Sequence, residues 1–209
     1  MKQQGSYSGK KIGLLGGSFD PIHYGHIRIA ENAYQEFGLD EVWFIPAGHS
    51  PNKAEENMTP ASIREHIVSI AIENYPYFRV SDIELRSAET SYTYRTMEKL
   101  HQQYPDSRFY FIMGADSLDY FEHWKHPEII CKYAVILAAV RDSMNVAQIQ
   151  SKISQIKELF PASIFPLHYK KIQVSSTQLR GMANRHVLNS SCLPQAVIDY
   201  INQNHLYGS

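Results

Sequence analysis

A glycine-rich stretch, GGSFDPIHYGH at residues 16–26, constrains this chain more than any other feature. Residues 11–15 before it form a short apolar run typical of a buried strand, and residues 27–37 after it carry apolar side chains at helical spacing. The sequence therefore predicts a strand that turns into a helix across a loop with little side-chain bulk. Such a loop exposes backbone N–H groups at the positive end of a helix dipole, which is a phosphate-binding arrangement.

Two histidines mark the start of the predicted helix. His23 and His26 are three residues apart, so both can point from one helical face toward whatever the loop binds. The stretch matches neither the dinucleotide pattern GxGxxG nor the P-loop pattern GxxxxGK[ST], and neither occurs elsewhere in the sequence. Phosphate binding is the favoured interpretation, with a helix-capping pair and a metal-binding HxxH pair as alternatives.

The length and charge of the chain limit its organisation and its partners. Its 209 residues, 44% of them hydrophobic, suffice for one core, and we expect a flexible lead-in at residues 1–10 and a single domain at residues 11–209. Lysine and arginine number 20 against 21 aspartates and glutamates, and the only basic pairs are Lys10-Lys11 and Lys170-Lys171. A nucleic-acid polymer would require a basic surface stripe, so we expect no such partner.

No segment predicts a membrane location or an oxidising compartment. The first nine residues are polar, and no later run approaches the ~20 apolar residues that cross a bilayer. Cys131 and Cys192 are far apart and belong to no CxxC pair, which favours free structural thiols. We therefore expect a cytoplasmic protein with no membrane partner.

Apolar runs and helical patterns alternate along the chain. Strands are expected at residues 11–15, 41–46, 78–82, 108–113, 134–140 and 163–167. Helices are expected at residues 27–37 with a stop at Gly38, from a Thr59-Pro60 cap to about 75, and at 92–104, 117–133 with a break near His126-Pro127, 145–160, 175–183 and 194–204. This order predicts the α/β class, with a doubly wound parallel sheet, helices on both of its faces and a small C-terminal helical region.

Polar residues follow several of the predicted strands. Because ligands of such sheets lie at the carboxyl ends of the strands, we expect five sites to converge there: the glycine loop, Lys53, Asp116, Arg141 and the loop at Ser175. In the last of these, Ser175-Ser176-Thr177 begins a helix with hydroxyls and free N–H groups, and Arg180 lies one turn further along. This pattern indicates a second anion site, and an ordinary helix cap with a solvated arginine is the alternative.

These motifs resemble one protein family. The glycine loop followed by His23-Tyr24-Gly25-His26 is similar to the HxGH nucleotidyltransferase superfamily and, over its full length, to the nicotinate-nucleotide adenylyltransferase family. Residues 174–180 are similar to that family's ISSTxxR motif, with valine in place of isoleucine. The resemblance implies a Rossmann-like nucleotidyltransferase fold, ATP as a substrate carrying Mg²⁺, and few metal ligands from the protein, none of which we name. It implies catalytic roles for His23, His26 and Arg180, and ATP binding by Gly16, Gly17, Ser18, Phe19, Gly25, Asp116, Ser175, Ser176 and Thr177.

Three further residues are expected to bind the second substrate. Thr93 ends a stretch similar to the family's GxSYT, which implies contact with a nicotinate carboxylate. Trp124 lies in a stretch similar to GADxL with a downstream FxxW and would stack on the pyridine ring, with simple burial in the core as the alternative. Lys53 lies in a PNK stretch similar to the family's PHK loop and would neutralise a phosphate, or else is solvated. Asn52 and the residues after Arg141 depart from the family's pattern, which leaves the roles of Asn52 and Arg141 open.

The absence of an activated nucleophile narrows the chemistry. Nothing in the sequence resembles a serine or cysteine nucleophile with its base. An acceptor that is itself a phosphate monoester has a second pKa of ~6 and needs no base, so the protein must align it with the ATP α-phosphorus and stabilise charge on pyrophosphate. The resemblance implies adenylyl transfer from ATP to nicotinate mononucleotide, giving nicotinate adenine dinucleotide and pyrophosphate on the way to NAD.

Other functions stay open at this point. The nearest are the same chemistry on nicotinamide mononucleotide or phosphopantetheine, and transfer from CTP to a polyol phosphate. A nucleotide-binding sensor without turnover belongs to a different class. Each of these is compatible with a homo-oligomer.

Overall fold

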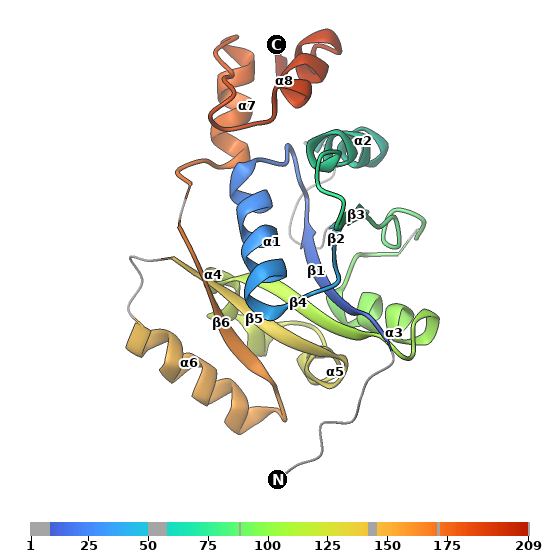
Figure 1. Cartoon of the computed structure of the whole chain (residues 1–209), viewed down its shortest axis with the longest axis vertical. Helices are drawn as coiled ribbons and strands as arrows, with labels where there is room; N and C mark the ends of the chain where they lie inside the picture. Colours follow the sequence, from blue (N-terminus) through green and yellow to red (C-terminus); the bar gives the residue numbers. More distant parts are fainter. Residues whose placement is uncertain (1–8, 50–57, 88, 142–145, 171, 209) are drawn as a thin grey trace.

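A six-stranded parallel sheet organises the computed structural model, which describes residues 9–49, 58–87, 89–141, 146–170 and 172–208. Its strands are β1 (Lys11–Gly17), β2 (Glu41–Pro46), β3 (Phe78–Val80), β4 (Arg108–Gly114), β5 (Ala134–Arg141) and β6 (Ile164–Tyr169). Their order is β3-β2-β1-β4-β5-β6, and every neighbouring pair is parallel (Figure 1). The predicted doubly wound sheet is confirmed, and the strand order reverses between β1 and β4.

Helices connect the strands along the described residues. They are α1 (Tyr24–Phe37), α2 (Ala61–Ile72), α3 (Thr93–Gln103), α4 (Ala115–Leu118), α5 (Pro127–Tyr133), α6 (Val146–Leu159), α7 (Ser176–Asn184) and α8 (Gln195–Gln203), with 3₁₀ turns η2 (Phe121–His123) and η3 (Leu206–Gly208). Helix α1 ends at Gly38 as predicted, because a φ of 56° there is the left-handed conformation that glycine adopts without strain. The predicted break at His126-Pro127 is confirmed, since His126 has a φ of 51° and α5 starts at Pro127.

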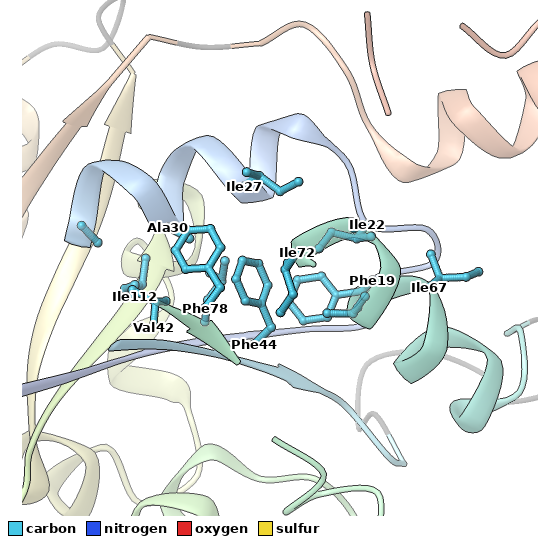
Figure 2. Close-up of a cluster of buried hydrophobic side chains, with 14 of the residues drawn as sticks. Phe19, Ile22, Ile27, Ala30, Val42, Phe44, Ile67, Ile72, Phe78 and Ile112 are labelled. Carbon is cyan, nitrogen blue, oxygen red and sulfur yellow. The ribbon is translucent and has the colours of Figure 1, made fainter. Parts of the chain in front are cut away.

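The sheet separates two apolar layers. In β4, Phe109, Phe111 and Met113 pack in the layer that includes α3, α5 and α6, whereas Tyr110 and Ile112 pack in the layer that includes α1 and α2. Figure 2 shows part of this second layer, in which aromatic and aliphatic side chains from the strands meet those of α1 and α2. Because side chains alternate between the faces of a strand, burial on both faces explains the continuous apolar runs of the sequence.

Several boundaries differ from the prediction: α1 begins at Tyr24 rather than at residue 27, and β6 ends at Tyr169 rather than at residue 167. Helix α2 begins at Ala61 with Pro60 at the N-cap position, so Thr59 does not cap it. It ends at Ile72 rather than near residue 75. Pro76 disfavours a helical conformation at Tyr75, where the prediction had placed the end of the helix. Strand β3 stops at Val80 and pairs with β2 alone, as the edge of the sheet.

The last helices of the chain lie beside the carboxyl ends of the strands. Helix α8 contacts α2, and η3 contacts both α7 and α8 (Figure 1). Cys131 and Cys192 are free, as predicted, and burial raises the pKa of the Cys131 thiol to about 11. Among the helices of the described segments, none has the length and apolar character needed to span a bilayer.

Candidate active site

Two glycines lie at the switch point of the sheet, the place between β1 and β4 where the strand order reverses. Gly16 near the end of β1 and Gly114 at the end of β4 both lie at the carboxyl edge, on neighbouring strands. A Cβ added to either would meet no atom within 4 Å, so the backbone there is accessible to a ligand. Asp116 follows directly in α4 and is exposed. The edge therefore offers open backbone and a carboxylate where doubly wound sheets bind nucleotides.

The glycine loop turns sharply after β1. Phe19 has a left-handed φ of 47° and is buried, with its ring 5.1 Å from the ring of His26, measured between centroids. A Cβ on Gly17 would lie 3.0 Å from the Phe19 ring, so a side chain at this position would push the ring away. Phe19 was predicted to bind ATP; because its side chain is buried, only its backbone can face a ligand.

The two histidines lie on one face, as their spacing predicts, but their rings stack on each other and one makes the helix-capping contact that the sequence left as an alternative. Their ring centroids are 3.8 Å apart with 23° between the planes, and His26 Nδ1 accepts a hydrogen bond from the His23 backbone N–H at 3.2 Å. Because Nδ1 of His26 is an acceptor, its Nε2 carries the proton and is a donor. A Cβ on Gly25 would lie 2.9 Å from Cε1 and Nδ1 of His23, so the HxGH pattern needs glycine to make room for the first histidine.

Burial keeps His23 uncharged. Its side chain is 8% exposed, and the loss of solvation lowers its pKa to about 4. Its Nδ1 is buried and has no hydrogen-bond partner in the described part of the chain. At neutral pH His23 is therefore a neutral ring that shapes the loop, whereas the half-buried His26 is the better placed of the two to donate to a ligand.

The start of α7 is bonded to the glycine loop. Ser175 is the predicted N-cap, and its Oγ accepts from the Gln178 N–H at 3.3 Å. The Ser176 hydroxyl donates to the Pro21 carbonyl at 2.9 Å, and Arg180 Nη1 donates to the Asp20 carbonyl at 2.7 Å. Arg180 Nη2 also donates to Thr177 Oγ1 at 3.3 Å. The structure thus brings the two predicted anion sites together.

Two buried charged residues, Arg64 and Asp20, support the glycine loop, and neither of them was identified from the sequence. Arg64 of α2 is 1% exposed, and its guanidinium donates to the carbonyls of Thr59, Ser18 and Ala47 at 2.8, 2.7 and 2.8 Å respectively. Burial lowers the pKa of Arg64, and the nearby Asp20 charge opposes that shift. A signal existed, because Arg64 lies three and four residues before Ile67 and Val68 on the buried face of α2.

The residues predicted for the second substrate lie on a neighbouring part of the edge. Thr93 is the first residue of α3, and Lys125 Nζ lies 4.6 Å from the centroid of the Tyr92 ring, which joins α3 to the segment that carries Trp124. Trp124 is half-buried against Phe111 and Phe121, with centroids 6.1 and 5.6 Å apart, so the core contact that the sequence left as an alternative is present.

The loop after β2 is joined to the same stretch. The Ser91 N–H donates to the His49 carbonyl at 2.9 Å, and Ser91 Oγ accepts from the Gly48 N–H at 3.1 Å. Lys53 and Asn52, further along that loop, lie outside the described residues. Arg141 ends β5 at the carboxyl edge. Within the described segments no group of three or more His, Cys, Asp or Glu side chains could hold a metal ion.

A doubly wound parallel sheet with two bonded helix starts at its switch point defines a nucleotide-binding α/β protein. The model of the cytidylyltransferase-like family matches residues 14–182, and the chain belongs to that family. Its relatives include proteins named "probable nicotinate-nucleotide adenylyltransferase". One from Lachnoclostridium phytofermentans is 36% identical and covers 95% of this chain and 99% of its own length. One from Clostridium botulinum is 37% identical and covers 93% of this chain and 97% of its own length.

Solved structures share the fold. The Plasmodium falciparum nicotinic acid mononucleotide adenylyltransferase complexed with NaAD has a TM-score of 0.75 at 22% identity, covering 95% of this chain and 97% of its own. The same enzyme complexed with APC has a TM-score of 0.74 at 21% identity, with the same coverage. The resemblance predicted from the motifs is confirmed by the curated relatives, and the predicted Rossmann-like nucleotidyltransferase fold by these structures.

Proposed function

We propose that this nucleotidyltransferase moves the adenylyl group of ATP to nicotinate mononucleotide, forming nicotinate adenine dinucleotide and pyrophosphate for NAD biosynthesis. One observation carries the proposal: the His23–His26 stack and Arg180 are anchored to the same loop, at the switch point of the sheet. The names of the relatives, and the NaAD bound to the Plasmodium falciparum protein, support this choice of acceptor.

The reaction needs alignment and charge stabilisation rather than a base. A phosphate oxygen of the acceptor attacks the α-phosphorus of ATP, the new P–O bond forms, and the bond from the α-phosphorus to the bridging oxygen breaks. The electron pair leaves with pyrophosphate. The Nε2–H of His26 and the guanidinium of Arg180 supply donors for the charge that develops on the phosphates, and Ser175, Ser176, Thr177 and the backbone at Gly16, Gly17, Ser18 and Phe19 hold the triphosphate.

Mg²⁺ enters as part of the substrate MgATP in this proposal. Mg²⁺ in such sites is held by substrate phosphates, by water and by only one or two carboxylates, so it needs few protein ligands. The donors at the loop are imidazole and guanidinium groups, which suit phosphate oxygens rather than a hard cation. The ion would neutralise phosphate charge, while the chain's own residues orient the triphosphate.

Selection of the acceptor falls to the second part of the edge. We assign the nicotinate carboxylate to the start of α3 at Thr93, the pyridine ring to the exposed part of Trp124 and the acceptor phosphate to Lys53. Asp116 belongs with the ATP-binding residues in this proposal and would bond a ribose hydroxyl. Discrimination between a carboxylate and an amide is strong when a pocket is lined by donors, because the wrong group leaves them unpaired.

Pyrophosphate release tests this function directly. The protein is incubated with MgATP and, in parallel, with nicotinate mononucleotide, nicotinamide mononucleotide, phosphopantetheine or no acceptor. Release that depends on nicotinate mononucleotide is the expected result. Release with another acceptor would retain adenylyl transfer and overturn the carboxylate assignment, and ATP binding without any release would make the protein a nucleotide sensor.

A further inference from the structure

A partly buried hydrogen-bond network, centred on the buried Asp20, connects the glycine loop to the far end of the chain. The hydroxyl of Tyr207 in η3 donates to Asp20 Oδ1 at 2.9 Å, across 187 residues of sequence. Asp20 is 3% exposed, and its Oδ2 accepts from the Thr59 N–H at 3.4 Å. Its carbonyl is the acceptor for Arg180 Nη1 at 2.7 Å. Asp20 therefore accepts a hydrogen bond from Tyr207 at its carboxylate and one from Arg180 at its backbone carbonyl.

The C-terminal turn has an unusual conformation that delivers this hydroxyl. Tyr207 has a φ of 61° and His205 a φ of 49°, both in the left-handed region that non-glycine residues rarely adopt. Gly208, with a φ of 79°, lies so close to α7 that a Cβ would be 2.8 Å from Nδ2 of Asn184. Strained backbone of this kind persists only when surrounding contacts hold it, and such positions cluster at functional sites.

The network connects the C-terminal turn η3 to Arg180, which we expect to bind phosphate. A buried carboxylate that loses a hydrogen-bond donor is left with its charge less well compensated. The side chain and the carbonyl of Asp20 belong to one residue, so the hydrogen bond from Tyr207 restrains the residue whose carbonyl anchors Arg180. Burial raises the pKa of the Tyr207 hydroxyl, so the hydroxyl keeps its proton and stays a donor to the carboxylate.

We propose that Tyr207 is a positioning residue of the nucleotide site, acting through Asp20 to hold Arg180 and the glycine loop in place for the ATP phosphates. The C-terminal turn η3 is then part of the ATP site although it touches no substrate. The inference rests on the proposed function for its substrate, but it concerns ATP binding alone.

The test is the affinity for MgATP, measured by titration calorimetry without an acceptor. Tyr207→Phe keeps the ring and removes only the hydroxyl, and we expect about tenfold weaker binding, the effect of one hydrogen bond to a buried charge. In turnover, KM for ATP should rise while KM for nicotinate mononucleotide stays unchanged. Tyr200→Phe is the matched control, because the Tyr200 ring lies 4.7 Å from the ring of His66, measured between centroids, and Tyr200 is not among the described partners of Asp20. Wild-type affinity is expected for it.

A double-substitution cycle shows whether the effect passes through Asp20. In an Asp20→Ala background, Tyr207→Phe should change ATP affinity less than twofold. A tenfold effect that persists there would overturn the proposal, as would unchanged affinity in Tyr207→Phe with only a lower melting temperature. If Asp20→Ala does not fold, the pair of tyrosine variants decides alone.

The two proposals fail in different ways. Wild-type protein that binds MgATP but releases no pyrophosphate contradicts the proposed function, and the calorimetric comparison still decides the role of Tyr207. Wild-type protein that does not bind MgATP overturns both.

Discussion

A buried ionisable side chain at the amino edge of the sheet is fully hydrogen-bonded and charged, whereas one at the carboxyl edge has a ring nitrogen with no partner among the described residues and is neutral. At the amino edge, the Glu41 carboxylate accepts hydrogen bonds from Lys10, Trp43 and Arg79. Burial alone would raise the pKa of Glu41, but these hydrogen bonds outweigh it and lower the pKa to about 2. At the carboxyl edge, burial lowers the pKa of His23 to about 4, and its Nδ1 has no partner in the described part of the chain.

This difference separates stability from function. A buried carboxylate with three donors is stabilised in its charged form and helps to hold strand β2 in place. A buried imidazole with an orphaned nitrogen destabilises the fold, as does the left-handed Phe19 beside it, and such features concentrate at functional sites. We therefore expect substitutions at the amino edge to lower stability and substitutions at the carboxyl edge to lower activity.

The largest expected effect is the loss of the His26 imidazole. His26→Ala should reduce the rate of pyrophosphate release by about 10²–10³, because one donor to the developing charge is removed. Its melting temperature should stay within a few degrees of wild type, since the side chain is only half-buried. Turnover near the wild-type rate in the folded variant would contradict the mechanism.

The free energy of unfolding should depend on pH because burial lowers the pKa of His23. The pKa of His23 is about 4 in the folded chain and 6.5 in the unfolded chain. Between pH 6.5 and pH 4 the imidazole is therefore protonated in the unfolded chain but neutral in the folded chain. The free energy of unfolding should therefore fall by about 3 kcal/mol as the pH drops from 6.5 to 4. Urea unfolding of wild type and His23→Asn at several pH values measures this loss, which should be smaller in the variant. Parallel curves would show that another group titrates.

A smaller loss of activity is expected when the glycine between the histidines gains a side chain. Gly25→Ala places a Cβ 2.9 Å from the His23 ring, and the ring must move out of its stack with His26. We expect about a thirtyfold lower rate, or about 2 kcal/mol in transition-state stabilisation. Gly181→Ala in α7 is the control, since its Cβ meets no atom within 4 Å and alanine favours helix. Equal rates in both variants would mean that the histidine stack is not needed.

The smallest expected effect lies at the amino edge. Glu41→Gln should lower the free energy of unfolding by about 1–2 kcal/mol at pH 7, a moderate figure because Lys10 and Arg79 are more than half exposed and solvent screens their charges. Pyrophosphate release at 25 °C should match wild type. The wild type's advantage should be present above pH 4.5 and vanish as the pH falls toward 2, because the folded pKa is the lower one. A large loss of activity in Glu41→Gln would contradict the expectation that substitutions at the amino edge affect stability alone.

Local pattern was sufficient for most of the fold. The runs that became β1, β2, β4 and β5 are apolar enough to be recognised alone, and Gly38 and Ser175 end and begin helices by local chemistry. The pairing of His23 with His26 could also be predicted, because three residues along a helix bring two side chains onto one face. The predicted Thr59 cap was wrong, because Pro60 takes the N-cap position of α2 and the Thr59 backbone is bonded to Arg64 and Asp20.

The sequence by itself determined the alternation of strands and helices that predicts a parallel sheet, and the position of the glycine loop between a strand and a helix, since both are read from residues close together in the chain. Only the tertiary structure decided that Asp20 would join Arg180 and Tyr207, and that Arg64 would bind carbonyls of three separate residues. These contacts span up to 187 residues, and no local periodicity specifies such a partner. They form because packing excludes water around buried polar groups, which must then find each other.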